Sequence, residues 1–96
     1  MAAYMVYVRD RIIDPEELKK YEEESSKVKV TGAKTPLAFY GKVETLEGPK
    51  VDGVTIVPFE SMKAAEAAYN NPDYQKAMKH RLKGADYRVF ITEGVK

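Results

Sequence analysis

The sequence predicts an α+β domain in which helices cover one face of a four-stranded antiparallel sheet. Three observations support this fold class. Runs of β-branched and aromatic residues alternate with helical stretches in the order strand, helix, strand, strand, helix, strand. Good N-cap residues open the helical stretches. The 96 residues are 44% hydrophobic and 32% charged, a balance typical of a globular protein, so residues 1–96 are interpreted as a single domain.

The first strand is expected over Ala3–Arg9, where β-branched and aromatic residues predominate. Both of its faces are largely apolar, so both are expected to be buried against other parts of the protein or a partner. A helix follows in DPEELKKYEEESSKV, with Asp14 as N-cap and Pro15 at the first helical position. Its apolar stripe at helical spacing consists of Leu18, Tyr21, Ser25 and Val28.

Two strands are expected in the middle of the chain. The segment Leu37–Leu46 alternates between two sets of side chains, as a strand does. The turn EGPKVDG separates it from a third strand over Val54–Glu60. Pro58 cannot donate a hydrogen bond within a sheet, so it marks a bulge, an edge or the end of this strand.

The last third of the chain predicts a divided helix and a final strand. Ser61 is an N-cap candidate for the alanine-rich stretch MKAAEAAYN. Pro72 then restarts a helix with Asn71 as its cap, and Gly84 is expected to end it as the residue after the C-cap. The fourth strand is expected over Tyr87–Glu93 and is again apolar on both faces.

This β-α-β-β-α-β order is the ferredoxin-like split βαβ arrangement. One face of its sheet stays open in a monomer. Because three of the four strands are apolar on both faces, the open face would form an apolar patch that predicts a partner. A second copy, packed sheet against sheet about a two-fold axis, is the simplest partner. We therefore expect a homodimer formed through the sheet faces.

The composition argues against several classes of function. The absence of cysteine removes disulfides, zinc–thiolate sites, iron–sulfur clusters and thiol nucleophiles, and it is compatible with the cytoplasmic location that we expect. The net charge of +1 argues against a nucleic-acid or membrane-surface binder. No apolar run approaches the ~20 residues of a membrane span, and the N-terminus indicates a strand rather than a signal peptide. No nucleotide-binding motif is present, and we expect no metal and no cofactor.

His80 is the only histidine, and it lies on the last predicted helix. Helical geometry turns it away from the apolar seam of that helix. We therefore expect a solvated side chain rather than a general base or a ligand. A haem or metal site is less favoured still, because no second histidine exists to complete it. The sequence assigns no catalytic residue.

Arg81 lies on the apolar seam and should face inward or toward the rim of the sheet. An arginine in such a position needs a carboxylate partner, for which Asp10, Asp86 and Glu93 are candidates. A structural ion pair is the leading interpretation, and binding the anionic group of a ligand is the alternative.

The seven tyrosines suit an amphipathic cleft, since each offers an apolar ring and one polar group. Packing in the core and in a dimer interface would also account for them. The candidate ligand-binding residues are Arg81, Tyr40, Tyr74 and Tyr7.

Several short motifs occur in a specific order along nearly the whole chain. They are Asp14–Pro15 followed by Tyr21, LEG at Leu46–Gly48, PFES at Pro58–Ser61, YNNPDYQKAMKHR at Tyr69–Arg81, and EG at Glu93–Gly94. In this order and at these spacings the chain resembles the uncharacterised bacterial family called domain of unknown function 1330, in the dimeric α/β-barrel superfamily. The resemblance implies a dimer whose two sheets face each other around a small cleft. It implies no established activity, because the superfamily includes cofactor-independent monooxygenases, haem-degrading enzymes, isomerases and binding proteins.

The function expected from these observations is the binding of a small aromatic or acyl-type ligand in a cleft. One alternative is an enzyme of the cofactor-independent monooxygenase or isomerase type, in which tyrosines, Arg81 or His80 handle protons. Another is a structural or interaction protein. An enzyme requires a polar group with a shifted pKa in an enclosed pocket, whereas a binding protein requires only the pocket.

Overall fold

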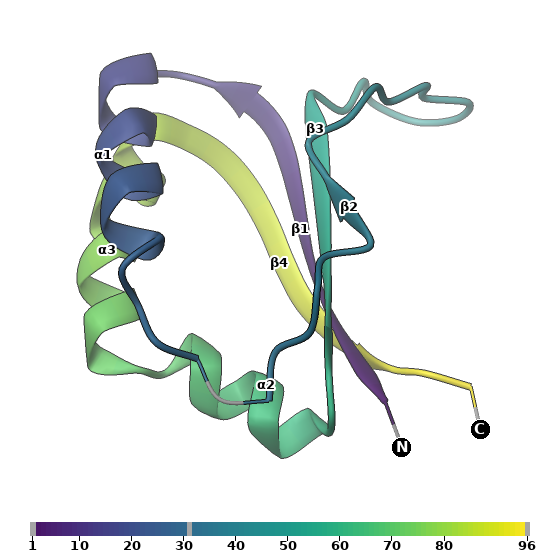
Figure 1. The fold of residues 1–96 in the computed structure, drawn as a ribbon. Helices are drawn as coiled ribbons and strands as arrows, with labels where there is room; N and C mark the ends of the chain where they lie inside the picture. Colours follow the sequence, from purple (N-terminus) through teal and green to yellow (C-terminus); the bar gives the residue numbers. More distant parts are fainter. Residues whose placement is uncertain (1, 31, 96) are drawn as a thin grey trace.

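The computed structural model describes residues 2–30 and 32–95. Figure 1 shows a curved sheet with the helices gathered on one side of it. The elements are β1 (Ala3–Ile12), α1 (Pro15–Ser25), β2 (Ala38–Phe39), β3 (Gly53–Phe59), α2 (Met62–Tyr69), α3 (Pro72–Gly84) and β4 (Ala85–Glu93). The strand order is β2-β3-β1-β4, and neighbouring strands are antiparallel. The predicted ferredoxin-like fold class is confirmed, with the second helix divided in two.

The predicted helix starts are confirmed in detail. In each helix a side-chain oxygen of the N-cap residue accepts a hydrogen bond from a backbone N–H of the first turn. The acceptors belong to Asp14, Ser61 and Asn71, and the donors are the N–H groups of Glu16, Ala64 and Asp73 at 2.8–3.1 Å. These bonds satisfy donors that have no partner within the helix. No helix in the described part of the chain has the length and apolar character that crossing a membrane requires.

The strand predicted over Leu37–Leu46 is wrong in length. β2 pairs with β3 at two positions, Ala38 with Ile56 and Phe39 with Thr55. Tyr40 then has a φ of 54°, a left-handed conformation that is uncommon for a residue with a side chain and that ends the strand. Residues 41–52 form no helix or strand. The alternating pattern in this stretch therefore belongs to an exposed loop.

Gly84 has a different role from the predicted one. It is the last residue of α3, and Ala85 is the C-cap. A Cβ atom on Gly84 would lie 2.9 Å from both the backbone nitrogen and Cγ of Leu18 in α1. The carbonyl oxygen of Gly84 also accepts hydrogen bonds from the N–H groups of Ile13 and Asp14, at 2.7 and 2.9 Å. This glycine thus permits the close approach of α1 to α3.

The two faces of the sheet have different surroundings. On the helix side, Met5 and Phe59 form the core with Ala65 of α2. Because side chains alternate along a strand, the neighbouring residues point to the other face. The register there places Val6 opposite Ile56 on one side and opposite Phe90 on the other. Phe90 is 47% exposed, and the helices lie on the far side of the sheet, so this face is open (Figure 1).

Candidate functional site

A cavity of about 310 Å³ lies between α1 and the helix-facing side of the sheet. It stays open because α1 packs along α3 rather than onto the strands. Its lining residues are Leu18, Tyr21, Glu22, Ser25 and Ser26 from α1 and its C-cap, Phe39 and Tyr40 from the end of β2, and Tyr7, Thr55, Val57 and Tyr87 from the other strands. The volume is at the lower end of the roughly 300–1,000 Å³ that is typical of small-molecule sites. The walls are mostly aromatic and aliphatic.

The left-handed backbone at Tyr40 directs its side chain back over the sheet. The Tyr40 and Tyr87 hydroxyl oxygens lie 2.7 Å apart and share a hydrogen bond. A Cβ atom on Gly53 would lie 2.8 Å from the Tyr40 ring, so the glycine leaves room for that ring. Arg9 stacks over the same ring at 4.3 Å from its centroid, and its Nε donates to Asp52 at 2.6 Å. At one end of the cavity, these contacts therefore hold the side chains of Tyr40 and Tyr87 in place.

Arg81 lies behind the part of the cavity wall formed by Tyr7, Tyr21 and Tyr87, and it is only 3% exposed. The prediction that it faces inward is confirmed. The guanidinium carbon lies 4.9 Å from the ring centroid of Tyr87 and 5.9 Å from those of Tyr7 and Tyr21. All three rings line the cavity. Arg81 is thus enclosed by aromatic faces, which attract a cation.

The predicted carboxylate partner of Arg81 is wrong. Asp10 binds Arg88 and Asp86 binds Arg11 at the surface. Among the described residues, no carboxylate forms an ion pair with Arg81, and Glu93 lies at the other end of β4. The Nε of Arg81 has no hydrogen-bond partner there either. The two expected aspartates instead pair with arginines of β1 and β4 that lie closer to them. These partners are 75 and 78 residues apart in the sequence, so the pairing cannot be predicted from sequence spacing.

The tyrosines around Arg81 stay neutral. Burial raises the pKa of Tyr7, Tyr21 and Tyr87 well above the ordinary value of 10.0. At Tyr7 and Tyr21 the neighbouring Tyr74 adds to the effect, and the hydroxyl oxygens of Tyr21 and Tyr74 lie 2.9 Å apart. Protonated hydroxyls donate and accept hydrogen bonds but carry no charge. They therefore do not balance the positive charge of Arg81.

Thr55 lies in the cavity wall and carries a buried hydroxyl. It is 4% exposed, and its Oγ1 has no hydrogen-bond partner among the described residues. The register places Thr55 directly opposite Tyr7, so both side chains project from the sheet into the same space. A buried hydroxyl without a partner costs stability.

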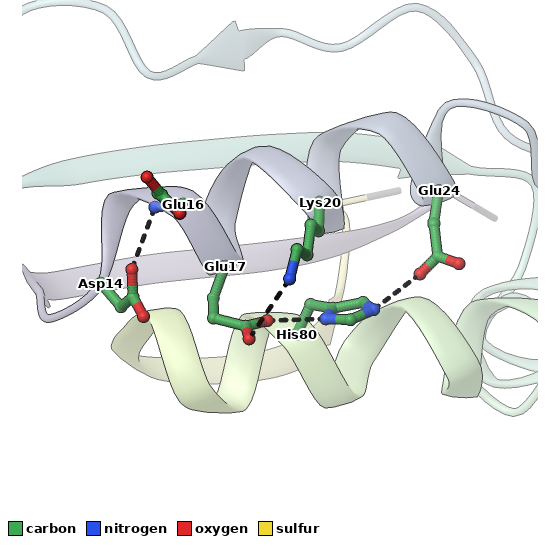
Figure 2. Close-up of polar contacts among 6 residues, drawn as sticks. All are labelled: Asp14, Glu16, Glu17, Lys20, Glu24 and His80. Carbon is green, nitrogen blue, oxygen red and sulfur yellow. Dashed lines mark hydrogen bonds and ion pairs between the residues drawn. The ribbon is translucent and has the colours of Figure 1, made fainter.

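The solvated position predicted for His80 is wrong. Figure 2 shows its ring held between two carboxylates of α1. Nδ1 lies 2.6 Å from Oε2 of Glu17, and Nε2 lies 3.0 Å from Oε2 of Glu24. The prediction placed His80 relative to the apolar seam of its own helix. Because α3 also packs against α1, a side chain that points away from this seam contacts α1 instead of solvent. Only an imidazolium, with hydrogens on both nitrogens, donates to both carboxylates.

Replacing His80 with alanine should lower the melting temperature by about 4 °C near neutral pH, because the contact joins the two helices at a partly exposed position. The hydrogen bond from His80 lowers the pKa of Glu17, and the charge of Lys20 adds to this. A lowered carboxyl pKa means that the stabilisation is present above the ordinary value of 4.5 and is lost as the pH falls through the lowered value. Thermal unfolding at about pH 6 and about pH 3 should show a difference between the proteins that shrinks in acid.

The matched control for this prediction is Lys79→Ala, which removes an exposed side chain from the same helix. It should leave the melting temperature nearly unchanged at both pH values. An equal effect of the two substitutions would contradict a stabilising contact between His80 and the carboxylates of α1.

The predicted site residues occupy two layers. Tyr7 and Tyr40 line the cavity, whereas Tyr74 and Arg81 lie directly behind its wall. Sequence reasoning missed Thr55, whose place on the helix-facing side follows from strand alternation once the register is known. No cluster of side chains suited to holding a metal ion occurs within residues 2–30 and 32–95.

Comparisons with known proteins place the chain among small ferredoxin-like proteins. The family model described as "Domain of unknown function (DUF1330)" matches residues 2–95. A search of curated proteins found no match. Among solved structures, the methylated RPA0582 protein of Rhodopseudomonas palustris is 25% identical, with a TM-score of 0.69 over 99% of this chain and 82% of that chain.

Two further structures share the fold at lower identity. A dimeric ferredoxin-like protein of unknown function from Thermobifida fusca YX is 14% identical, with a TM-score of 0.67 over 95% of this chain and 89% of that chain. SnoaB, a cofactor-independent oxygenase from Streptomyces nogalater, is 9% identical, with a TM-score of 0.66 over 99% of this chain and 93% of that chain.

Proposed function

The chain belongs to the DUF1330 family, whose description names no activity, and we propose that it binds a small aromatic or acyl-type ligand in the cavity between α1 and the sheet. The observation that carries this proposal is a cavity with mostly aromatic and aliphatic walls and the hydrogen-bonded hydroxyl pair of Tyr40 and Tyr87 among its lining residues. Apolar walls with a few fixed polar groups are typical of small-molecule sites. The rings of Tyr7 and Tyr87 would contact the ligand's flat or aliphatic part.

The proposal is one of binding rather than of a reaction. SnoaB is described as a cofactor-independent oxygenase, but at 9% identity the likeness concerns the fold alone. Folds of this kind carry many different functions. The raised pKa values of the cavity tyrosines also favour neutral donors and acceptors over a tyrosinate base.

Filling the cavity should abolish binding without unfolding the protein. Ser25 lines the cavity from the last turn of α1, so the ring of Ser25→Phe would occupy the ligand's space. Calorimetric titration with two neutral probes, 2-naphthamide and octanamide, should give a Kd below about 1 mM for at least one of them in the wild type. We expect Ser25→Phe to weaken that binding by about tenfold or more.

Glu23→Phe is the matched control, since Glu23 is an exposed α1 residue outside the cavity lining. It adds the same aromatic group to the same helix and should leave the Kd unchanged. Absence of binding to the wild type by both probes and by the carboxylate 2-naphthoate would contradict the proposal, as would equal binding by Ser25→Phe.

We also propose that two copies of the chain associate through the open faces of their sheets. The support is the apolar surface there, which includes Val6, Ile56 and the 47% exposed Phe90. The Thermobifida fusca neighbour is described as dimeric. A stable interface of this kind would bury roughly 800 Å² per subunit. This pairing leaves the cavity on the helix side of each sheet.

A further inference from the structure

We propose that the cavity takes its ligand as an anion, a small aromatic or acyl acid in its oxyanion form, and that the buried charge of Arg81 selects it. This inference rests on the proposed function, since both concern the same cavity. It adds the charge of the ligand and names the residue that recognises this charge.

The first step is the state of Arg81 itself. It is 97% shielded from solvent and forms no ion pair within the described ranges; its Nε has no hydrogen-bond partner, and its hydrogen-bonding neighbour is the Tyr74 hydroxyl rather than a carboxylate. An arginine side chain stays protonated at every physiological pH. Burying a charge without a partner of opposite sign is costly, and aromatic rings offset only part of this cost. The site thus holds a positive charge that an incoming anion would neutralise.

The second step is the path from this charge to the cavity. The rings of Tyr7, Tyr21 and Tyr87 lie 4.9–5.9 Å from Arg81, and the same three residues line the cavity. An anion that accepts a hydrogen bond from a tyrosine hydroxyl of this wall would therefore lie close to the guanidinium. In a partly dry interior, charges at such distances interact more strongly than they do in water.

The third step is the supply of hydrogen-bond donors for an oxyanion. Tyr40 and Tyr87 share one hydrogen bond but have two hydroxyl hydrogens, so one hydrogen is left to donate. Tyr87 is also the lining ring that lies nearest to Arg81, at 4.9 Å, so this donor and the buried charge lie at the same part of the cavity wall.

The other charges near the cavity agree with this orientation. Arg9 is already balanced by Asp52, at 2.6 Å, and Arg81 is not. Glu22 is the carboxylate among the described lining residues, and it is exposed on α1. Repulsion from Glu22 would turn the anionic end of a ligand away from α1 and toward the strand side. The apolar part would then lie under Leu18 and beside Val57.

A pair of probes with the same shape isolates the charge. Calorimetric titration of 2-naphthoate and 2-naphthamide should show that the wild type binds the carboxylate about tenfold more tightly or better. In Arg81→Met, which keeps an unbranched apolar stem without the charge, the two probes should bind equally. In Arg88→Met, which removes an exposed arginine paired with Asp10, the preference should persist.

The outcomes separate this inference from the proposed function. Equal binding of both probes to the wild type would overturn anion selection and leave the ligand cavity standing, whereas binding of neither probe would overturn both. A preference that persists in Arg81→Met would overturn the role of Arg81. If Arg81→Met does not fold, Arg81→Gln makes the same comparison, and the wild-type ratio still decides whether the cavity selects anions.

Discussion

Replacing Gly84 with valine should lower the free energy of unfolding by about 3 kcal/mol. A Cβ atom at this position would lie 2.9 Å from the backbone nitrogen of Leu18 and 2.9 Å from its Cγ. A side chain can rotate away, but the backbone of α1 can move only if the helix moves. Such a shift would also strain the hydrogen bonds from Ile13 and Asp14 to the Gly84 carbonyl. Valine gains little in helix propensity to offset this cost.

Urea unfolding at a fixed protein concentration measures this effect, since a dimer's stability depends on concentration. The matched control is Gly41→Val, because nothing lies within 4 Å of a Cβ atom at Gly41 and its backbone is not left-handed. The control should change stability by about 0.5 kcal/mol or less. Gly84→Val with wild-type stability would show that α1 and α3 are not packed as closely as described.

Replacing Ile56 with lysine should dissociate the proposed dimer, with a Kd raised by about a hundredfold or more. Ile56 pairs with Ala38 on one side and with Val6 on the other, so it lies in the interior of the open sheet face. Because the two subunits are related by a two-fold axis, the substitution places two lysines in one interface. Each ammonium group would lose its hydration there without a carboxylate to pair with, which is costly.

Sedimentation velocity at micromolar concentration distinguishes the two states. Leu82→Lys is the control, because Leu82 is 61% exposed on α3, on the helix side of the sheet. It should sediment as the wild type does. The proposed dimer would be refuted by a monomeric wild type, and the proposed interface by an Ile56→Lys variant that stays dimeric.

The fold follows from local patterns that the sequence displays directly. Asp14, Ser61 and Asn71 cap helices as predicted, because capping depends on residues only two or three positions apart. The strand around Leu37–Leu46 could not be predicted in the same way. Alternation shows that a segment fits a strand, but pairing depends on a partner. The register with β3 covers only Ala38 and Phe39, and the flanking N–H groups of Leu37 and Tyr40 donate to β3 carbonyls.

The site was predictable only in part, for a related reason. Arg81 was predicted to face inward from periodicity, which depends on one element at a time, whereas Tyr7 was a candidate because tyrosine suits an amphipathic cleft. The neighbours of His80 and the missing carboxylate of Arg81 depend on how α1 packs along α3 beside the sheet. That placement depends in turn on Gly84, whose close contact with Leu18 is a property of the tertiary structure.

The location of a bound probe tests the ligand-binding cavity most directly. Amide ¹H–¹⁵N spectra recorded during titration with 2-naphthamide should show their largest shifts around the cavity, at Tyr7, Ser25, Thr55 and Tyr87. The open sheet face and the loop of residues 41–52 should change little. Shifts concentrated at Val6, Ile56 and Phe90, or in that loop, would place the ligand elsewhere and contradict the proposed site.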